Sequence, residues 1–282
     1  MLKNFLDGYN CTIMAYGQTG SGKTYTMGTS DIKCQNLETQ GLIPRFVNDL
    51  FENLNQPQEG DQKTVFKIKA SFLEIYGEDI FDLLSANSAQ TKNDPTNRPS
   101  LNVREDEAGR VFVQGQNELE VTSARAALEV LSVGSHNRIT AATAMNAGSS
   151  RSHAVFTLQL EQTVKNADSN EDISSMTSKL TFVDLAGSER IKRTGAEGQR
   201  LKEGIQINSG LFNLGQVINS LADEQKLKSG MKSSFVPYRN STLTHLLKDA
   251  LGGNSQTLFL ACISPAESNE SETYSTLSVS FQ

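Results

Sequence analysis

The 282-residue sequence contains no tryptophan, and it has only three cysteines and three histidines. Cys11, Cys34 and Cys262 are far apart and follow no metal-ligand spacing. An odd number of scattered cysteines argues against a disulfide framework and favours a reducing compartment. We expect each of them to be a small apolar residue.

Long apolar runs and a targeting segment are also lacking. No stretch approaches 18 apolar residues, which excludes a membrane-spanning helix. The first 17 residues lack the charged start, apolar stretch and cleavage site of a secretory signal. The 32 acidic residues outnumber the 26 basic ones, giving a net charge of −6, which argues against broad binding to nucleic acid or an anionic membrane. We therefore expect an intracellular, soluble protein.

The composition, 37% hydrophobic and 21% charged, is that of an ordinary globular protein. Short β-like runs alternate with helical ones, which predicts an α/β fold with a mixed central sheet. The polar stretches 55–63, 86–100 and 166–178 are expected to be surface loops, and no interdomain linker separates parts of the chain, so we expect one domain over 1–282. The expected strands are 11–16, 65–75, 111–113, 154–162, 180–183 and 257–263. The expected helices are 23–27, 42–54, 123–137, 198–222 and 241–251.

The helix expected over 241–251 has the clearest local signals. Its apolar residues recur every three or four positions along one face. Asn240 or Ser241 can cap its start, and Gly252 and Gly253 provide a stop.

Residues 17–24 read GQTGSGKT and match the phosphate-binding P-loop, with Gly17, Gly22, Lys23 and Thr24 at its four fixed positions. The motif follows a β-like run and opens a helical one, so its backbone N–H groups can surround phosphate oxygens. Lys23 would neutralise the β- and γ-phosphates, and the Thr24 hydroxyl would bind Mg²⁺. A glycine-rich surface turn is the alternative. The predicted nucleotide-binding residues are Gly17, Gln18, Thr19, Gly20, Ser21, Gly22, Lys23, Thr24 and Tyr25.

A second nucleotide motif follows the run 180–183, where the sequence reads DLAG. Asp184 suits a water-mediated contact with Mg²⁺, and the amide of Gly187 can contact a γ-phosphate. The guanine-reading NKxD motif is missing, which disfavours a small GTPase.

A third motif, NAGSSRSH at 146–153, joins the other two to resemble the nucleotide pocket of kinesin motor domains. Further matches cover 72–84, 194–208 and 236–269. The stretches TAMNAGSSRSHAVFTLQLEQ and ACISPAESN look most like the fourth kinesin class, the chromokinesins. The resemblance implies a three-layer P-loop NTPase fold, with helices on both faces of the sheet, and a microtubule-dependent motor ATPase. It also implies ATP and Mg²⁺ as ligands and a location on cytoplasmic microtubules.

The resemblance also implies roles for individual residues. Ser149, Ser150 and Ser152 correspond to the switch I hydroxyls that reach the γ-phosphate, Mg²⁺ and the attacking water. Arg151 and Glu189 correspond to the family's ion pair between the two switches. A solvated serine-rich loop remains the alternative for 146–153, and His153 is expected to pack or to hydrogen-bond. The predicted catalytic residues are Ser149, Ser150, Arg151, Gly187 and Glu189, and the predicted metal ligands are Thr24, Ser150 and Asp184.

The segment 190–202 contains five basic residues and only one acidic residue. A basic cluster in an acidic protein indicates a directed contact with an acidic partner, and in kinesins the matching segment faces the microtubule. A solvated helix face is the alternative. Thr242 and His245 stand where the family has Lys and Arg, which predicts weaker binding to the microtubule. The predicted tubulin contacts are Lys192, Arg193, Arg200, Lys202 and Arg239.

The match to the family is expected to be incomplete at both ends. The family's first strands and its adenine-stacking segment have no counterpart, so the strand 257–263 is expected to keep one unpaired edge. Residues 273–282 stand where kinesins carry a final basic helix and the neck linker. With no coiled-coil segment, the chain is expected to be a monomer. Two alternatives remain: a degenerate or truncated, non-catalytic module that senses nucleotide and binds microtubules, and an unrelated P-loop ATPase.

Overall fold

The structure is a computed structural model that describes residues 1–29, 38–56, 62–85, 98–144, 149–166, 172–189, 199–227 and 235–280. Its strands are β1 (Cys11–Tyr16), β2 (Gln62–Tyr76), β3 (Asp79–Asp82), β4 (Asn102–Glu105), β5 (Val111–Gln114), β6 (Leu119–Glu120), β7 (His153–Asn166), β8 (Asp172–Asp184) and β9 (Gln256–Ala261). Its α-helices are α1 (Leu2–Leu6), α2 (Lys23–Met27), α3 (Leu42–Leu54), α5 (Ala124–Ala144), α7 (Gln199–Leu227), α8 (Thr242–Leu246), α9 (Lys248–Gly252) and α10 (Glu270–Ser280). Short 3₁₀ turns are η3 (Ser149–Arg151), η4 (Tyr238–Asn240) and η5 (Glu267–Asn269). Among the described residues, no helix combines the length and the hydropathy that a membrane span requires.

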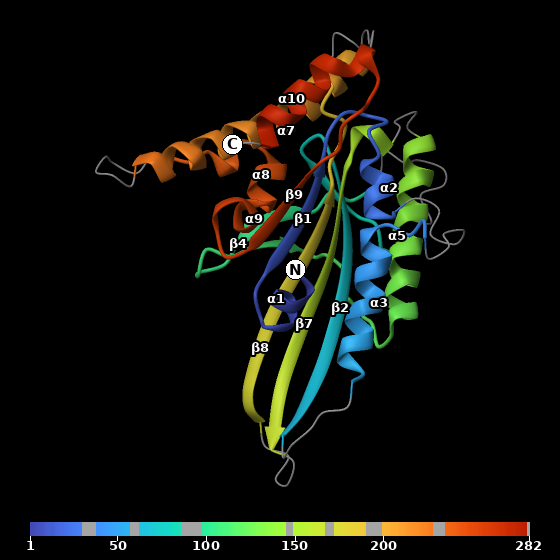
Figure 1. The fold of residues 1–282 in the computed structure, drawn as a ribbon, viewed down its shortest axis with the longest axis vertical. Coiled ribbons are helices and arrows are strands. Elements are labelled where there is room, and N and C mark those ends of the chain that lie inside the picture. Colours follow the sequence, from blue (N-terminus) through green and yellow to red (C-terminus); the bar gives the residue numbers. More distant parts are fainter. Residues whose placement is uncertain are drawn as a thin grey trace.

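One large sheet runs through the molecule in the order β3-β2-β7-β8-β1-β9, and β6 pairs with β2 (Figure 1). Strand β1 is parallel to both of its neighbours, β8 and β9. The pairs β2–β3, β2–β7 and β7–β8 are antiparallel. The predicted mixed sheet is therefore confirmed.

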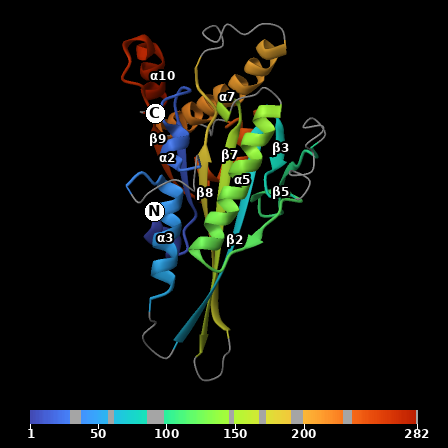
Figure 2. The ribbon, with the colours of Figure 1, turned by 90° about the vertical axis from the view of Figure 1, so that its right-hand side faces the viewer.

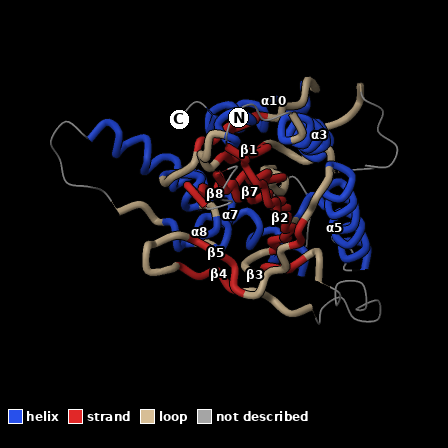
Figure 3. The backbone as a smooth tube through the Cα atoms, turned by 90° about the horizontal axis from the view of Figure 1, so that it is seen from below, coloured by secondary structure: helices blue, strands red, loops and turns tan. Residues whose placement is uncertain are grey.

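Helices cover both faces of this sheet. Helices α2, α3 and α5 lie on one face, whereas α7, α8, α9 and the β4–β5 hairpin lie on the other (Figures 1, 2 and 3). Alternate residues of β1 supply the two cores: Ile13 and Ala15 face the first, Met14 and Tyr16 the second. A strand with both faces buried reads as a continuous apolar run, which is the pattern of this segment. The predicted three-layer arrangement is confirmed.

Helix α5 packs closely against the sheet at Gly134. A Cβ atom added at Gly134 would come within 2.2 Å of the Phe72 ring on β2. The glycine therefore lets the helix approach the strand directly. One turn later on the same helix is Arg138, a buried arginine whose role in the candidate site is described below.

The loop predicted over 166–178 is partly wrong. Residues 172–178 belong to β8 and pair with β7 in an antiparallel ladder that produces a long hairpin (Figure 1). The residues from Asp172 to Thr177 are exposed on both sides of the strand, so they carry no alternating apolar pattern. Backbone pairing, and not side-chain burial, holds this half of the strand.

The helix predicted over 241–251 is interrupted. Ser241 caps α8 as expected, because its hydroxyl accepts a hydrogen bond of 3.2 Å from the backbone N–H of Thr244. Leu247, at φ −90° and ψ 10°, separates α8 from α9. The backbone bonds from Leu247 to Leu243 and from Leu251 to Leu247 remain, so the interruption is a local kink.

The sequence patterns did not predict α1, β3, β4, β6 or α10. Most of these are short or largely exposed, and α10 has no basic residue among its 11. Strand β9 ends the sheet, because within the described residues it pairs with β1 alone. The predicted unpaired edge of the 257–263 segment is confirmed.

Candidate nucleotide-binding site

The predicted P-loop lies between β1 and α2, at the carboxyl ends of the parallel strands β1 and β8. Gly17, Gly20 and Gly22 adopt φ values of +149°, +80° and +95°. A Cβ atom at Gly17 would come within 2.0 Å of the Cys262 carbonyl oxygen, beyond the end of β9. The glycines therefore let the loop turn sharply and pack against the next strand. The predicted order of strand, loop and helix is confirmed.

Lys23 begins α2 and is only 7% exposed. Its Nζ donates to the carbonyl oxygens of Gly17 and Gln18, each at 2.8 Å. Burial lowers the pKa of Lys23, and the nearby carboxylates of Asp184 and Glu189 oppose this shift. The ammonium group is thus held inside the loop that it is predicted to help bind phosphate.

Thr24 and Asp184 meet across the site. The Thr24 hydroxyl donates to Oδ2 of Asp184 at 2.8 Å, and a guanidinium nitrogen of Arg138 lies 3.1 Å from the same oxygen. Oδ1 of Asp184 is buried and has no hydrogen-bond partner among the described residues. A buried carboxylate oxygen without a partner is costly, and a hydroxyl beside a carboxylate is a ligand set that Mg²⁺ prefers. These residues therefore fit the predicted metal site.

Within the described residues, no group of three or more His, Cys, Asp and Glu side chains could hold a metal ion. The site at Thr24 and Asp184 offers one hydroxyl and one carboxylate, and Mg²⁺ commonly takes one or two carboxylates and fills its shell with water and phosphate oxygens.

Residues 149–153 and 184–189, called the two switch segments from here on, contact each other and the P-loop. The backbone N–H of Gly187 donates to the Ser150 carbonyl at 2.9 Å, and that of Ser188 donates to the Gly17 carbonyl at 3.2 Å. Lys23, Ser150, Asp184 and Gly187, which are remote in sequence, therefore lie around one site.

Glu189 points at the P-loop. Its two carboxylate oxygens accept hydrogen bonds from the backbone N–H and the hydroxyl of Thr19, at 2.8 and 2.6 Å. Asn208 of α7 donates to the Glu189 carbonyl at 3.2 Å. Arg151 ends the turn η3, and its pairing with Glu189 stays a prediction. The side chain of Ser149, on the same turn, lies outside the described residues.

The remaining predicted binding residues belong to the loop and to the first turn of α2. The hydroxyl of Ser21 donates to the Gln18 carbonyl at 2.8 Å, which stabilises the loop. Tyr25 is 60% exposed, so its side chain points away from the buried part of the site. Its part in nucleotide binding stays a prediction.

Two further residues hold the switch segments, and only one of them was noticed in the sequence. His153 is fully buried, and its Nδ1 accepts a hydrogen bond from the Ala186 backbone N–H at 3.0 Å. Burial, helped by Arg138 and Lys23, lowers the pKa of His153 to about 3, so the ring is neutral with its proton on Nε2. The expected hydrogen-bonding role is confirmed.

Arg138 was missed. Its guanidinium donates to the Ser152 carbonyl at 2.8 Å and to the Ser152 hydroxyl at 3.3 Å, in addition to its contact with Asp184. A lone arginine among the apolar residues of a helix is the signal that could have identified it, because buried charges are almost always paired.

The predicted tubulin contacts are only partly described. Lys192 and Arg193 lie outside the described residues, and of Arg200 and Lys202 only the helical backbone of α7 is described. Arg239 is exposed, and its guanidinium donates to both carboxylate oxygens of Glu105 on β4, at 2.9 and 3.3 Å.

Glu105 also contacts two further side chains, those of His245 and Lys248. The ring of His245 lies 2.9 Å from one carboxylate oxygen, and the ammonium group of Lys248 lies 3.4 Å from the other. Hydrogen bonds from Arg239 and then His245 lower the pKa of Glu105 to about 2. These four residues are called the Glu105 cluster below.

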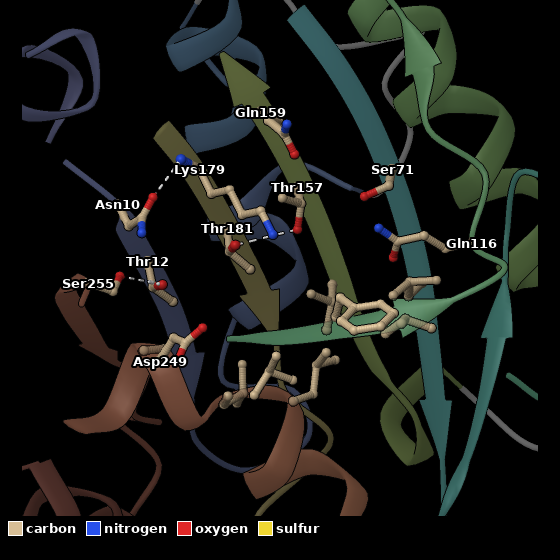
Figure 4. A pocket seen from close by; sticks show the side chains of 18 of the residues that line it. Asn10, Thr12, Ser71, Gln116, Thr157, Gln159, Lys179, Thr181, Asp249 and Ser255 are labelled. Carbon is tan, nitrogen blue, oxygen red and sulfur yellow. Dashed lines mark hydrogen bonds between the residues drawn. The ribbon is translucent and has the colours of Figure 1, made fainter. Parts of the chain in front are cut away.

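A cavity of about 260 Å³ lies between the sheet, β5 and the α8–α9 segment, away from the predicted nucleotide residues. Figure 4 shows a polar row along its sheet wall, in which the Thr12 and Ser255 hydroxyls are 3.0 Å apart and the Lys179 N–H donates to Asn10. No predicted site residue lines this cavity.

Comparison with known proteins agrees with this geometry. The family model described as "Kinesin motor domain" matches residues 1–281. Among curated proteins, the chain is 50% identical over 278 residues to "Chromosome-associated kinesin KIF4" of Xenopus laevis. The aligned region covers 98% of this chain and 21% of that protein. The chain is 47% identical over 289 residues to "Kinesin-like protein KIN-4C" of Oryza sativa subsp. japonica, covering 98% and 22%. The chain thus spans about a fifth of the length of these relatives.

Two solved structures are similar over 99% of the chain and 72% of their own length. One is a fast kinesin studied for its ATPase mechanism and interactions with microtubules, with a TM-score of 0.83 and 40% identity. The other is a KIF14 dimer in a two-heads-bound state with AMP-PNP in complex with a microtubule, with a TM-score of 0.82 and 42% identity.

Proposed function

Because the chain belongs to the kinesin motor domain family, we propose that it binds ATP with Mg²⁺, hydrolyses the bond between the β- and γ-phosphates and couples this cycle to microtubule binding. In this proposal residues 1–282 act as one motor domain. The observation that carries it is the convergence of three segments: Thr24 is bonded to Asp184, and the loop after Asp184 is bonded to both Ser150 and Gly17.

Binding of the triphosphate begins with the P-loop. The backbone N–H groups of a glycine-rich loop that precedes a helix can surround an anion, and the start of α2 favours negative charge. Lys23 exchanges its contacts with the Gly17 and Gln18 carbonyls for the β- and γ-phosphates. The other predicted nucleotide-binding residues between Gly17 and Tyr25 contact the phosphates mainly through their backbone N–H groups.

Thr24, Ser150 and Asp184 are the residues that would hold the metal, Asp184 through water. When bound, Mg²⁺ neutralises charge on the phosphate oxygens. Oδ1 of Asp184 supports this assignment, because it is a buried acceptor to which no donor of the described residues is bonded.

The switch residues position the water that attacks the γ-phosphate. The Gly187 amide leaves the Ser150 carbonyl to contact the γ-phosphate, and the hydroxyls of Ser149 and Ser150 orient the water. Glu189 leaves Thr19, whose N–H belongs to the phosphate cradle, and pairs with Arg151. Phosphoryl transfer depends on such positioning and on charge neutralisation more than on a strong base.

The proposed track is the microtubule. The basic cluster between 190 and 202 and Arg239 supply positive charge on an otherwise acidic chain, which favours a directed contact with an acidic partner. Similarity to a kinesin solved in complex with a microtubule supports the same partner. A microtubule motor acts in the cytoplasm on the cytoskeleton, and we propose that the domain by itself is monomeric.

The test is ATP turnover by the purified protein with and without microtubules. We expect turnover that microtubules increase and that Lys23→Ala reduces by at least about a hundredfold. Lys67→Ala, a change of an exposed lysine paired with Glu120 on β2 and β6, is the matched control and should behave as the parent does. A folded parent protein without turnover in either condition contradicts the proposal.

A further inference from the structure

Two arginines bracket one buried carboxylate on β2. Both terminal nitrogens of Arg98 lie 3.2 Å from Oε2 of Glu74, and Nε of Arg138 lies 4.0 Å from Oε1. The side chains of Arg98, Glu74 and Arg138 are 6%, 4% and 4% exposed. Charges this deeply buried interact strongly because little water screens them.

The other side of Arg138 faces the candidate nucleotide site. The same guanidinium contacts Asp184 at 3.1 Å and the Ser152 carbonyl at 2.8 Å. Asp184 in turn accepts the Thr24 hydroxyl. The buried charges therefore alternate along one row, from Arg98 through Glu74 and Arg138 to Asp184, and the row ends at the predicted magnesium ligands.

Arg98 reaches this row from outside the nucleotide-binding segments. Its guanidinium lies 4.3 Å from the centre of the Phe81 ring. The segment that follows it is bonded to the edge strand β3, since the Leu101 N–H donates to the Ile80 carbonyl and the Ile80 N–H donates to the Ser100 hydroxyl. The position of Arg98 is thus set by the edge of the sheet.

We propose that Arg98 is a positioning residue for the magnesium site. By pairing with Glu74, it leaves Arg138 directed at Asp184 and Ser152. Without Arg98, Arg138 would be the cation nearest to Glu74 among the described residues, and Glu74 would draw that guanidinium away from Asp184. Substitution of residues that orient the metal ligands without touching the metal typically changes metal affinity. This inference rests on the proposed function.

The experiment measures how the release of a fluorescent ADP analogue from the protein depends on free Mg²⁺. For Arg98→Gln we expect the half-saturating Mg²⁺ concentration to rise about tenfold. Arg104→Gln is the matched control, because Arg104 is exposed on the same segment and bonds only to Gln114 of β5 among the contacts described here. It should leave the Mg²⁺ dependence unchanged.

Two further variants separate positioning from a general loss of structure. Arg98→Lys keeps a cation beside Glu74 and should stay within about threefold of the parent. In the double variant Arg98→Gln with Glu74→Gln, the carboxylate that would attract Arg138 is also removed, so the Mg²⁺ dependence should return toward that of the parent. A merely structural role predicts that the double variant is at least as impaired as Arg98→Gln.

Thermal unfolding of each variant is recorded in parallel. An Arg98→Gln protein that is less stable but keeps the parent's Mg²⁺ dependence overturns the inference, as does a double variant that shows no recovery. If nucleotide release from the unsubstituted protein does not depend on Mg²⁺, the proposed function is contradicted, and the inference fails with it.

Discussion

The Nδ1 atom of His153, at the start of β7, accepts a hydrogen bond of 3.0 Å from the backbone N–H of Ala186. Ala186 lies directly before Gly187, and His153 directly follows the serine-rich turn. The bond therefore fixes the two switch segments to each other at the base of the site. Because the ring accepts, it must be neutral, in agreement with its lowered pKa.

The first prediction concerns the stability of the protein as a function of pH. The pKa of His153 is about 3 in the folded protein and 6.5 without burial. Between these values the unfolded chain binds a proton that the folded chain does not, so the free energy of unfolding falls as the pH falls. The contribution reaches about 1.4 kcal/mol per pH unit.

In His153→Asn, which has an acceptor but no titrating ring, this contribution disappears. Urea unfolding from neutral to mildly acidic pH should show the parent losing stability more steeply than the variant. Equal slopes contradict the prediction. His153→Leu, which leaves the Ala186 N–H unpaired, should be less stable than the parent at neutral pH by about 1–3 kcal/mol.

The second prediction concerns the metal ligand on α2. Thr24→Val removes the hydroxyl that meets Asp184 with little change in shape, and it should weaken Mg²⁺-dependent nucleotide binding by at least about tenfold. Thr24→Ser keeps the hydroxyl and serves as the control. Titration of a fluorescent nucleotide at several Mg²⁺ concentrations measures both, and identical titrations for Val and Ser would exclude the hydroxyl as a ligand.

The third prediction concerns the close packing of the P-loop. Gly17→Ala places a methyl group against the Cys262 carbonyl and should destabilise the protein by about 2 kcal/mol or more, with loss of nucleotide binding. Gly109→Ala is the control, because Gly109 has a φ of +76° with nothing within 4 Å of an added Cβ. Its cost should be limited to backbone strain, about 1–2 kcal/mol. Equal unfolding free energies for the two variants would show that the contact with Cys262 is unimportant.

The fourth prediction concerns the Glu105 cluster. Glu105→Gln removes the charge that engages the exposed Arg239, so microtubule binding should become about threefold tighter at low salt, with a smaller difference at high salt. The exposed Glu107 lies in the turn after β4, and Glu107→Gln is the matched control. Cosedimentation with microtubules measures both variants. Unchanged binding by Glu105→Gln would remove Arg239 from the proposed contact.

The P-loop could be predicted because its chemistry is local. Three glycines, a lysine and a threonine within eight residues need only a preceding strand and a following helix, and the strand has an apolar run of its own. The buried row through Arg138 and Glu74 could not be predicted in this way. Its members lie on α5 and β2, far apart in sequence, and only the packing of that helix on the sheet brings them together.

The long β7–β8 hairpin shows the same limit for the fold. The half of β8 near Leu180 was predicted from its buried residues, whereas the half near Asp172 has exposed side chains throughout. That half is held by backbone hydrogen bonds to β7, which any sequence without proline can make. Side-chain patterns therefore located the part of the strand that borders the site and missed the part that extends beyond it.

The most direct test of the account is an experimental structure of the protein with Mg²⁺ and a non-hydrolysable ATP analogue. We expect Lys23 on the terminal phosphates, the metal beside Thr24 and Asp184, and the Gly187 amide turned from Ser150 to the γ-phosphate. A bound nucleotide elsewhere, with Lys23 still on the Gly17 and Gln18 carbonyls, would contradict the account.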